Sequence, residues 1–149
     1  MKIKEVKRFS QRVYAGLLKL LPQLDPDARL LTEDGFKKIL KSKQTHFFIA
    51  ETENKEIAGM LSAAIYYVPT GTKFWIEDVV VDKAFRGKGT GKELMFHAMK
   101  FAKSTGAKSV DLTSRPSRVA ANKLYQELGF ELRETNVYRY NLKQKTAGI

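Results

Sequence analysis

Six consecutive residues near the middle of the chain, Arg86-Gly87-Lys88-Gly89-Thr90-Gly91, have the composition of an anion-binding loop. They follow an apolar stretch that ends Val79-Val80-Val81-Asp82 and precede a segment whose apolar residues recur at helical spacing. The start of a helix presents unpaired N–H groups and the positive end of a dipole, and glycines let a ligand come close to the backbone. A pyrophosphate is therefore a suitable ligand for this loop, and the alternative is a glycine-rich turn without a ligand.

Two better-known phosphate motifs do not fit these residues. Counted from Gly87, both a P-loop and a dinucleotide fingerprint need a glycine where the chain has Lys92. The pattern that does fit is Arg-x-x-Gly-x-Gly, at Arg86, Gly89 and Gly91.

The elements that must position the loop follow from hydrophobic spacing and turn residues. Strands are expected at residues 1–8, 45–51, 57–68, 73–82, 109–113, 130–133 and 137–142, and helices at 10–22, 33–41, 89–104 and 117–128. Ser10, Thr32 and Ser117 are expected to cap three of the helices, and Pro22 is expected to end the first. Residues 143–149 are expected to form a frayed tail.

Length and composition narrow the class of protein. The 149 residues are expected to form one domain, residues 1–149, and the absence of cysteine excludes disulfides and a cysteine nucleophile. Neither an apolar signal segment nor a run of about 20 apolar residues is present, so no membrane role is expected and the cytoplasm is the default location. A net charge of +11 attracts anions, of which a phosphorylated cofactor is one and nucleic acid another.

A second segment strengthens the interpretation of the glycine loop. Residues 121–130, Ala-Asn-Lys-Leu-Tyr-Gln-Glu-Leu-Gly-Phe, form a helical segment with an asparagine and a tyrosine, followed by Gly-Phe. Together with Arg86–Gly91 and the preceding strand, this segment resembles the two signatures of the GNAT superfamily of N-acetyltransferases. The resemblance implies an α/β (α+β) fold with a mixed sheet of about seven strands and about four flanking helices. It also implies that strands 73–82 and 109–114 splay apart to form a cleft for acetyl-CoA.

The resemblance also assigns residues to acetyl-CoA, as a cosubstrate with no metal. It implies that the loop binds the pyrophosphate and that the strand before it pairs with the pantetheine amides. The implied coenzyme-binding residues are Val79, Val80, Val81, Arg86, Gly87, Lys88, Gly89, Thr90, Gly91, Lys92, Asn122 and Tyr125, with Arg118 a further phosphate contact.

Transfer of the acetyl group to an amine needs a base and an acid, because the amine is protonated near neutral pH and the departing thiolate needs a proton. Glu77 is the first candidate for the base, since it shares the side-chain parity of Val79 and Val81. Asp78 is the second, because a bulge here would exchange the parity. Tyr125 is the candidate acid. For all three, the alternative is an ordinary surface or core residue.

Other signals carry less chemistry. His46 and His97 have no partners at metal-ligand spacing, so no metal is expected. The sequence lacks an RNA-binding signature, so nucleic acid is not expected as a partner. The alternatives to an active enzyme are a non-catalytic acyl-CoA-binding module and a basic RNA-associated protein. The amine acceptor is not identified; its pocket is expected to come from residues 11–31 and 135–140. A homodimer is one state that the resemblance allows.

Overall fold

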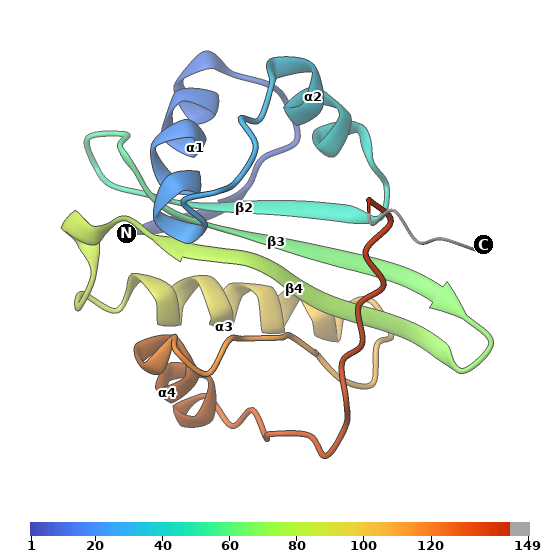
Figure 1. Cartoon of the computed structure of the whole chain (residues 1–149). Helices are drawn as coiled ribbons and strands as arrows, with labels where there is room; N and C mark the ends of the chain where they lie inside the picture. The colour runs from blue at the N-terminus through green and yellow to red at the C-terminus, as the bar shows by residue number, and fades with distance from the viewer. Residues whose placement is uncertain (144–149) are drawn as a thin grey trace. The chain divides into compact units, whose positions relative to one another are not determined.

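Four antiparallel strands, in the order β1-β2-β3-β4, form the sheet (Figure 1). Their bounds are Lys2–Glu5 for β1, Thr45–Glu51 for β2, Ile57–Val68 for β3 and Gly71–Val81 for β4. The computed structural model of the protein describes residues 1–143, in two compact units that run from Met1 to Arg115 and from Pro116 onward. The strands expected at 45–51 and 57–68 are confirmed to the residue, whereas one domain over residues 1–149 stays a prediction.

Three helices of the first unit cover the two faces of this sheet. Helices α1 (Gln11–Leu24) and α2 (Glu33–Lys41) lie on one face, and α3 (Thr90–Lys103) lies on the other (Figure 1). A short 3-10 turn, η1 (Lys83–Phe85), follows β4 and leads into the glycine loop. The glycine loop therefore lies between a strand and a helix, as the sequence predicts.

The expected caps of α1 and α2 are confirmed. The Ser10 hydroxyl accepts a hydrogen bond from the Val13 N–H at 3.3 Å, and the Thr32 hydroxyl accepts one from the Gly35 N–H at 3.0 Å. The prediction that Pro22 ends α1 is wrong, because the helix continues to Leu24. A proline this close to the end removes only one donor, and the last turn still closes downstream of it.

Strand β2 shows how both faces of the sheet are filled. Phe47 and Ile49 join a buried cluster with Phe36 on the α1 and α2 side. Phe48 points the other way, and its ring centroid lies 5.5 Å from that of Phe101 in α3. Because both faces are covered, the strand has an almost continuous apolar run instead of an apolar–polar alternation.

The prediction of about seven strands is wrong. Residues 109–113 contribute only an isolated parallel bridge between Trp75 and Asp111, with the Ile76 N–H 2.9 Å from the Asp111 carbonyl. The polar residues that follow, Thr113 and Ser114, do not extend the ladder along β4. The architecture is therefore mixed α/β with four helices and a four-stranded sheet among residues 1–143.

The second unit contains α4 (Val119–Glu127), which begins two residues later than expected and has Arg118, not Ser117, at its cap position. Residues 130–142, expected to be a hairpin, form no strand. Five of their large side chains are 60–95% exposed: Leu132, Val137, Tyr138, Tyr140 and Leu142. A two-stranded hairpin without a buried face is marginal in water, so alternation alone does not produce one. Apart from Lys143, the tail predicted for 143–149 lies outside the residues that the structure describes.

No helix within residues 1–143 combines the length and the apolar character that crossing a bilayer requires. Over the same residues, no three His, Asp or Glu side chains are grouped as metal ligands would be.

Glu51, at the end of β2, ties the sheet to α1 through a buried ionic cluster. Its side chain is 1% exposed, and its carboxylate oxygens lie 2.9 Å from Lys4, 2.6 Å from Arg12 and 3.5 Å from Lys55. Burial acts to raise the pKa of Glu51, but the hydrogen bonds from Lys4 and Arg12 outweigh it and hold the pKa at about 2, below its usual 4.5. Since the folded-state pKa is the lower one, this stabilisation is complete above the ordinary pKa and is lost as the pH falls toward 2.

We expect Glu51→Gln to lower the free energy of unfolding by about 2 kcal/mol at neutral pH. Removing one partner of a fully buried pair costs about 3–5 kcal/mol, and solvent around the half-exposed Lys4 and Arg12 reduces that loss. Urea unfolding at about pH 7 and pH 3 measures the effect. The wild-type protein should lose more stability between these two pH values than the variant does. Equal stability of the two proteins at neutral pH would show that the cluster contributes nothing.

Candidate active site

The start of α3 has an open, glycine-lined backbone. Gly89 is the N-cap of α3, with φ 80° and ψ 0°, and no side chain caps the helix. Gly87 also has a positive φ, 73°, and a Cβ added at either glycine would have no neighbouring atom within 4 Å. Both glycines are thus needed for the backbone conformation, and the space above them is free of protein atoms.

Thr90, the first residue of α3, supplies a polar group that needs a partner. The residue is 2% exposed, and its buried hydroxyl has no hydrogen-bond partner among the described residues. Leaving a buried hydroxyl unpaired costs about 1–3 kcal/mol. A phosphate oxygen at the start of α3 would accept from the open N–H groups of the first turn, so this helix start fits an anionic group.

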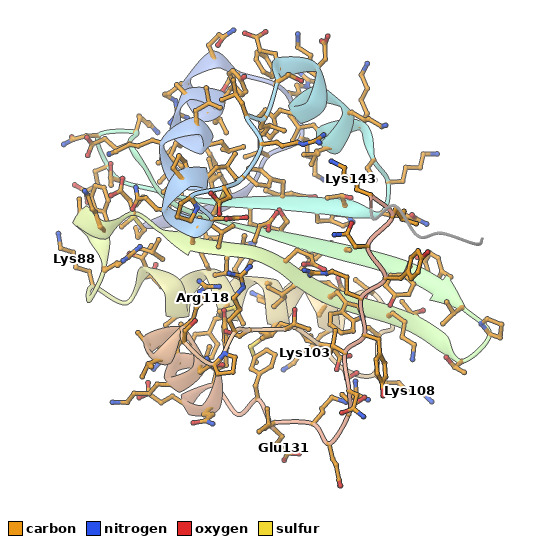
Figure 2. The ribbon with its side chains drawn as sticks, viewed as in Figure 1. Lys88, Lys103, Lys108, Arg118, Glu131 and Lys143 are labelled. Carbon is orange, nitrogen blue, oxygen red and sulfur yellow. The ribbon has the colours of Figure 1, made fainter. Side chains whose placement is uncertain are left out.

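The three basic side chains of the loop region contact neighbouring backbone and aromatic groups. The Arg86 Nε–H donates to the Val81 carbonyl at 3.0 Å, and the Lys88 ammonium lies 5.4 Å from the centre of the Phe85 ring. Lys92 lies 5.7 Å from the ring of Phe96 in the same way. Figure 2 shows Lys88 at the surface, on the connection between β4 and α3. Among residues 1–143 none of these three cations is paired with a carboxylate, so their positive charge is available to an anion.

Asp82 fixes the entrance to this connection. It is 1% exposed; one of its oxygens accepts from the Ala84 N–H at 3.0 Å, and the other lies 2.8 Å from the Lys19 ammonium of α1. The hydrogen bond from Lys19, followed by that from Ala84, holds the pKa of Asp82 below its usual value. Asp82 thus holds the start of the β4–α3 connection against α1.

A β-bulge interrupts β4 just before the loop. Ser62 of β3 pairs with Glu77 and Met60 pairs with Val80, so that Asp78 and Val79 together stand opposite a single residue. Asp78 has φ 45°, in the left-handed region that aspartate and asparagine tolerate better than most other residues. The extra residue changes which face of the sheet the following side chains point to.

The burial pattern shows this change of face. Phe74, before the bulge, packs against Phe101 of α3, whereas Val80, after it, joins the cluster around Leu17 of α1. The prediction that Glu77 shares one parity with Val79 and Val81 is therefore wrong, because an unbroken alternation does not run through the bulge.

A pocket of about 380 Å³ lies on the α1 and α2 side of the sheet. Its apolar walls include Leu17, Leu21, Phe36, Ile39, Phe47 and Met60. Asp78 and Ser62 contribute polar groups from the sheet, and Arg29 and Thr32 contribute them from the loop before α2. The lining overlaps the segment 11–31 that the sequence suggested for an acceptor pocket, and it lies wholly within the first unit.

The two candidate bases differ in their position. Both side chains are exposed, but Asp78 lines this pocket and Glu77 does not. Loss of hydration raises the pKa of Asp78. Loss of hydration, and then the charge of Asp78, raise the pKa of Glu77. Both carboxyls are shifted toward the range in which a general base works, but only Asp78 lines the pocket.

At the outer edge of β4, Trp75 forms a bridge with Asp111, and the Val81 carbonyl accepts a hydrogen bond from Arg86. The side chain of Val80 is buried in the core, and those of Val79 and Val81 are half-buried. Any role of these three residues toward a ligand therefore belongs to their backbone.

The second unit holds the remaining predicted residues. Tyr125 is the buried residue of α4, and its ring centroid lies 6.0 Å from that of Phe130. Burial raises the pKa of Tyr125, and the positive charge of Arg118 acts in the opposite direction. The Asn122 side-chain N–H donates to the Arg118 carbonyl at 2.9 Å, so this donor closes the first turn of its own helix.

Sequence reasoning missed Arg29. It lies in an irregular loop, exposed, with no partner among the described residues, and only the folding of that loop over the sheet brings it to the pocket. Arg29 could have been predicted from its position, because it is an arginine within the segment 11–31 that the sequence suggested for the acceptor pocket.

Known proteins resemble this chain in sequence and in fold. The model of the acetyltransferase (GNAT) family matches residues 11–130. An uncharacterised N-acetyltransferase of Methanocaldococcus jannaschii is 30% identical over 102 residues, which cover 66% of this chain and 45% of that protein. Streptothricin acetyltransferase of Streptomyces lavendulae is 35% identical over 98 residues, which cover 66% of this chain and 50% of that protein. The chain thus spans about half the length of these two relatives.

Among solved structures, glucosamine-6-phosphate N-acetyltransferase from Arabidopsis thaliana is similar with a TM-score of 0.76 and 26% identity, over 94% of this chain and 99% of that one. The family match extends from α1 to the end of the Gly-Phe motif and includes the glycine loop, the bulged strand and α4. The chain therefore belongs to the GNAT family of acetyltransferases.

Proposed function

We propose that the protein transfers the acetyl group of acetyl-CoA to a primary amine by direct attack of the amine in a ternary complex. The observation that carries the proposal is the start of α3. There, two left-handed glycines leave the backbone open, and the buried Thr90 hydroxyl has no hydrogen-bond partner within residues 1–143. Family membership supports the same ligand, since acetyltransferases of this kind use acetyl-CoA.

Coenzyme binding is assigned to three groups of residues. The backbone of residues 86–91 and the Thr90 hydroxyl hold the diphosphate, with Arg86, Lys88 and Lys92 adding positive charge. The backbone of Val79, Val80 and Val81 pairs with the pantetheine amides by strand addition. Asn122, Arg118 and Tyr125 are proposed as further contacts, from the resemblance of their segment to the family signature.

Asp78 is proposed as the base that removes a proton from the acceptor ammonium. Its carboxylate lines the one pocket described above, and its raised pKa brings it closer to that of the group it must deprotonate. Glu77 remains the second candidate, acting through water. The neutral amine attacks the thioester carbonyl, a C–N bond forms, the C–S bond breaks to release coenzyme A thiolate, and the nitrogen loses its second proton to solvent. Acetyl-CoA supplies the activated acetyl group.

Tyr125 is proposed as the acid that protonates the thiolate. Because burial raises its pKa above the ordinary value of 10, the hydroxyl keeps its proton throughout the neutral range. The acid form is the active one, so activity is retained below this pKa and lost above it. The high-pH limit set by Tyr125 therefore lies above pH 10.

We expect Tyr125→Phe to lower kcat by about 10- to 100-fold while KM for acetyl-CoA changes little, because only the proton donor is lost. The effect is smaller than for many acids because a thiolate is a stable leaving group. Tyr67→Phe is the control, since Tyr67 is 72% exposed and lies outside both the glycine loop and the pocket lining. Unchanged kcat in Tyr125→Phe would remove this residue from the mechanism.

The test of the function is release of free thiol from acetyl-CoA in the presence of a panel of amines. The chain has no cysteine, so a thiol-reactive dye reports the product without a background from the protein. We expect release that depends on both acetyl-CoA and an amine. Binding of coenzyme A without release for any amine would identify a binding module instead.

A further inference from the structure

The pocket beside Asp78 carries a second charge that the transfer reaction itself does not use. Of the residues that line it, only Asp78 and Arg29 are charged, and most of the others are apolar. Resting on the proposed function, we propose that the acceptor is an apolar amino acid or a close analogue, with its carboxylate held by Arg29 while its amine faces Asp78.

Arg29 is available for an external anion. Two cations of the helices over the pocket have acidic partners: Lys19 of α1 lies 2.8 Å from Asp82, and Lys37 of α2 lies 3.7 Å from Glu33. Arg29, among residues 1–143, has no such partner. A guanidinium offers two parallel N–H groups that match the two oxygens of a carboxylate, which an ammonium does not.

The acidic residues at the start of α2 do not compensate Arg29. The Glu33 carboxylate accepts from the Gln11 side chain at 2.6 Å and lies near Lys37. Asp34 is exposed, and neither residue lines the pocket. The walls therefore present one positive and one negative charge, which a zwitterion complements.

The same walls select against other amine classes. A polycationic acceptor would need several carboxylates, and Asp78 is the single acid in the lining. A volume of about 380 Å³ is at the small end of the range for ligand pockets. Leucine and phenylalanine side chains would gain from contact with Leu21, Phe36 and Met60. The geometry thus favours a small, apolar molecule with an amine and a carboxylate.

The experiment compares L-leucine with 3-methylbutylamine, which is leucine without its carboxylate, by thiol release. For the wild-type protein we expect a kcat/KM at least about tenfold higher for leucine. Arg29→Gln should raise KM for leucine by about 10- to 100-fold, the equivalent of one charge-assisted bidentate contact, and leave kcat and the reaction of 3-methylbutylamine unchanged. Arg29→Lys should restore part of the affinity.

Lys38→Gln is the matched control, because Lys38 is an exposed cation of α2 outside the pocket lining. This variant should leave kcat and KM unchanged for both leucine and 3-methylbutylamine. Calorimetric binding of N-acetyl-L-leucine gives a readout that does not need turnover, and Arg29→Gln should weaken it as well. Three results would overturn the inference. The wild-type protein could have the same kcat/KM for both amines, or Arg29→Gln could lose the same factor of kcat/KM for both. The third result is a higher kcat/KM for an aminoglycoside or for glucosamine 6-phosphate than for leucine. In each of these cases thiol release still supports the acetyltransferase, whereas release with no amine at all removes both proposals.

Discussion

Asp78→Asn is expected to lower kcat/KM for acetyl transfer by about 10²–10⁴-fold, the usual contribution of a general base. Asparagine is close in shape to aspartate and tolerates the positive φ of 45° at this position, so the bulge in β4 should persist. Coenzyme A affinity, measured by calorimetry, should stay within about twofold, because the cradle at the start of α3 is untouched. Alanine is a poorer choice, since it would combine the loss of the carboxylate with backbone strain.

The pH profile gives an independent check on Asp78. The base works as the carboxylate, so kcat/KM in the wild-type protein should fall as the pH drops through its pKa, which loss of hydration raises above the usual value. In Asp78→Asn this acidic limb should disappear from the residual activity. Glu77→Gln is the matched control, one residue earlier and outside the pocket. If Glu77→Gln shows the large loss and Asp78→Asn does not, the roles of the two carboxyls are exchanged.

The second large effect is expected at Gly89. Gly89→Ala should weaken coenzyme A binding by at least about 100-fold, because the added methyl group occupies the space where an anion meets the backbone and because φ 80° disfavours alanine. Calorimetric titration with coenzyme A, and with inorganic pyrophosphate as a smaller probe, measures the loss. The cost to stability should be only about 1 kcal/mol, since the new Cβ has no protein atom within 4 Å.

Gly106→Ala separates strain from binding. Gly106 follows α3, also has φ 80°, and has no atom within 4 Å of an added Cβ, but it lies outside the loop. The two variants should therefore lose similar stability in urea, and only Gly89→Ala should lose coenzyme affinity. If both bind coenzyme A like the wild-type protein, the start of α3 is an ordinary turn and the proposed function loses its main support.

The parts of the site that local sequence determines were predictable. Gly87 and Gly89 lie between an apolar strand and an amphipathic helix, and each of these signals is contained within a few neighbouring residues. The hydroxyl caps Ser10 and Thr32 are equally local. Thr90 belongs to the predicted loop, but its burial depends on packing that the sequence around it does not reveal.

The parts that depend on distant partners were not predictable. A bulge near Asp78 was stated only as an alternative, because it depends on Met60 and Ser62 of β3 pairing with residues on either side of it, and a single-strand pattern contains no record of that register. Arg29 reaches the pocket only because an irregular loop folds over the sheet. Residues 130–142 alternate like strands, but five of their large side chains are exposed, and this alternation forms no ladder.

The additional residue in β4 also limits how such a protein can evolve. Phe74, before the bulge, packs on the α3 side, and Val80, after it, packs on the α1 side. Loss of either Asp78 or Val79 would therefore turn Val80 and Asp82 onto the wrong side of the sheet. A deletion here would damage the hydrophobic interior, the Lys19 anchor and the acceptor chemistry in one step. New acceptor preferences in this scaffold should therefore arise by substitutions in the loop and helices that line the pocket, with the length of β4 kept constant.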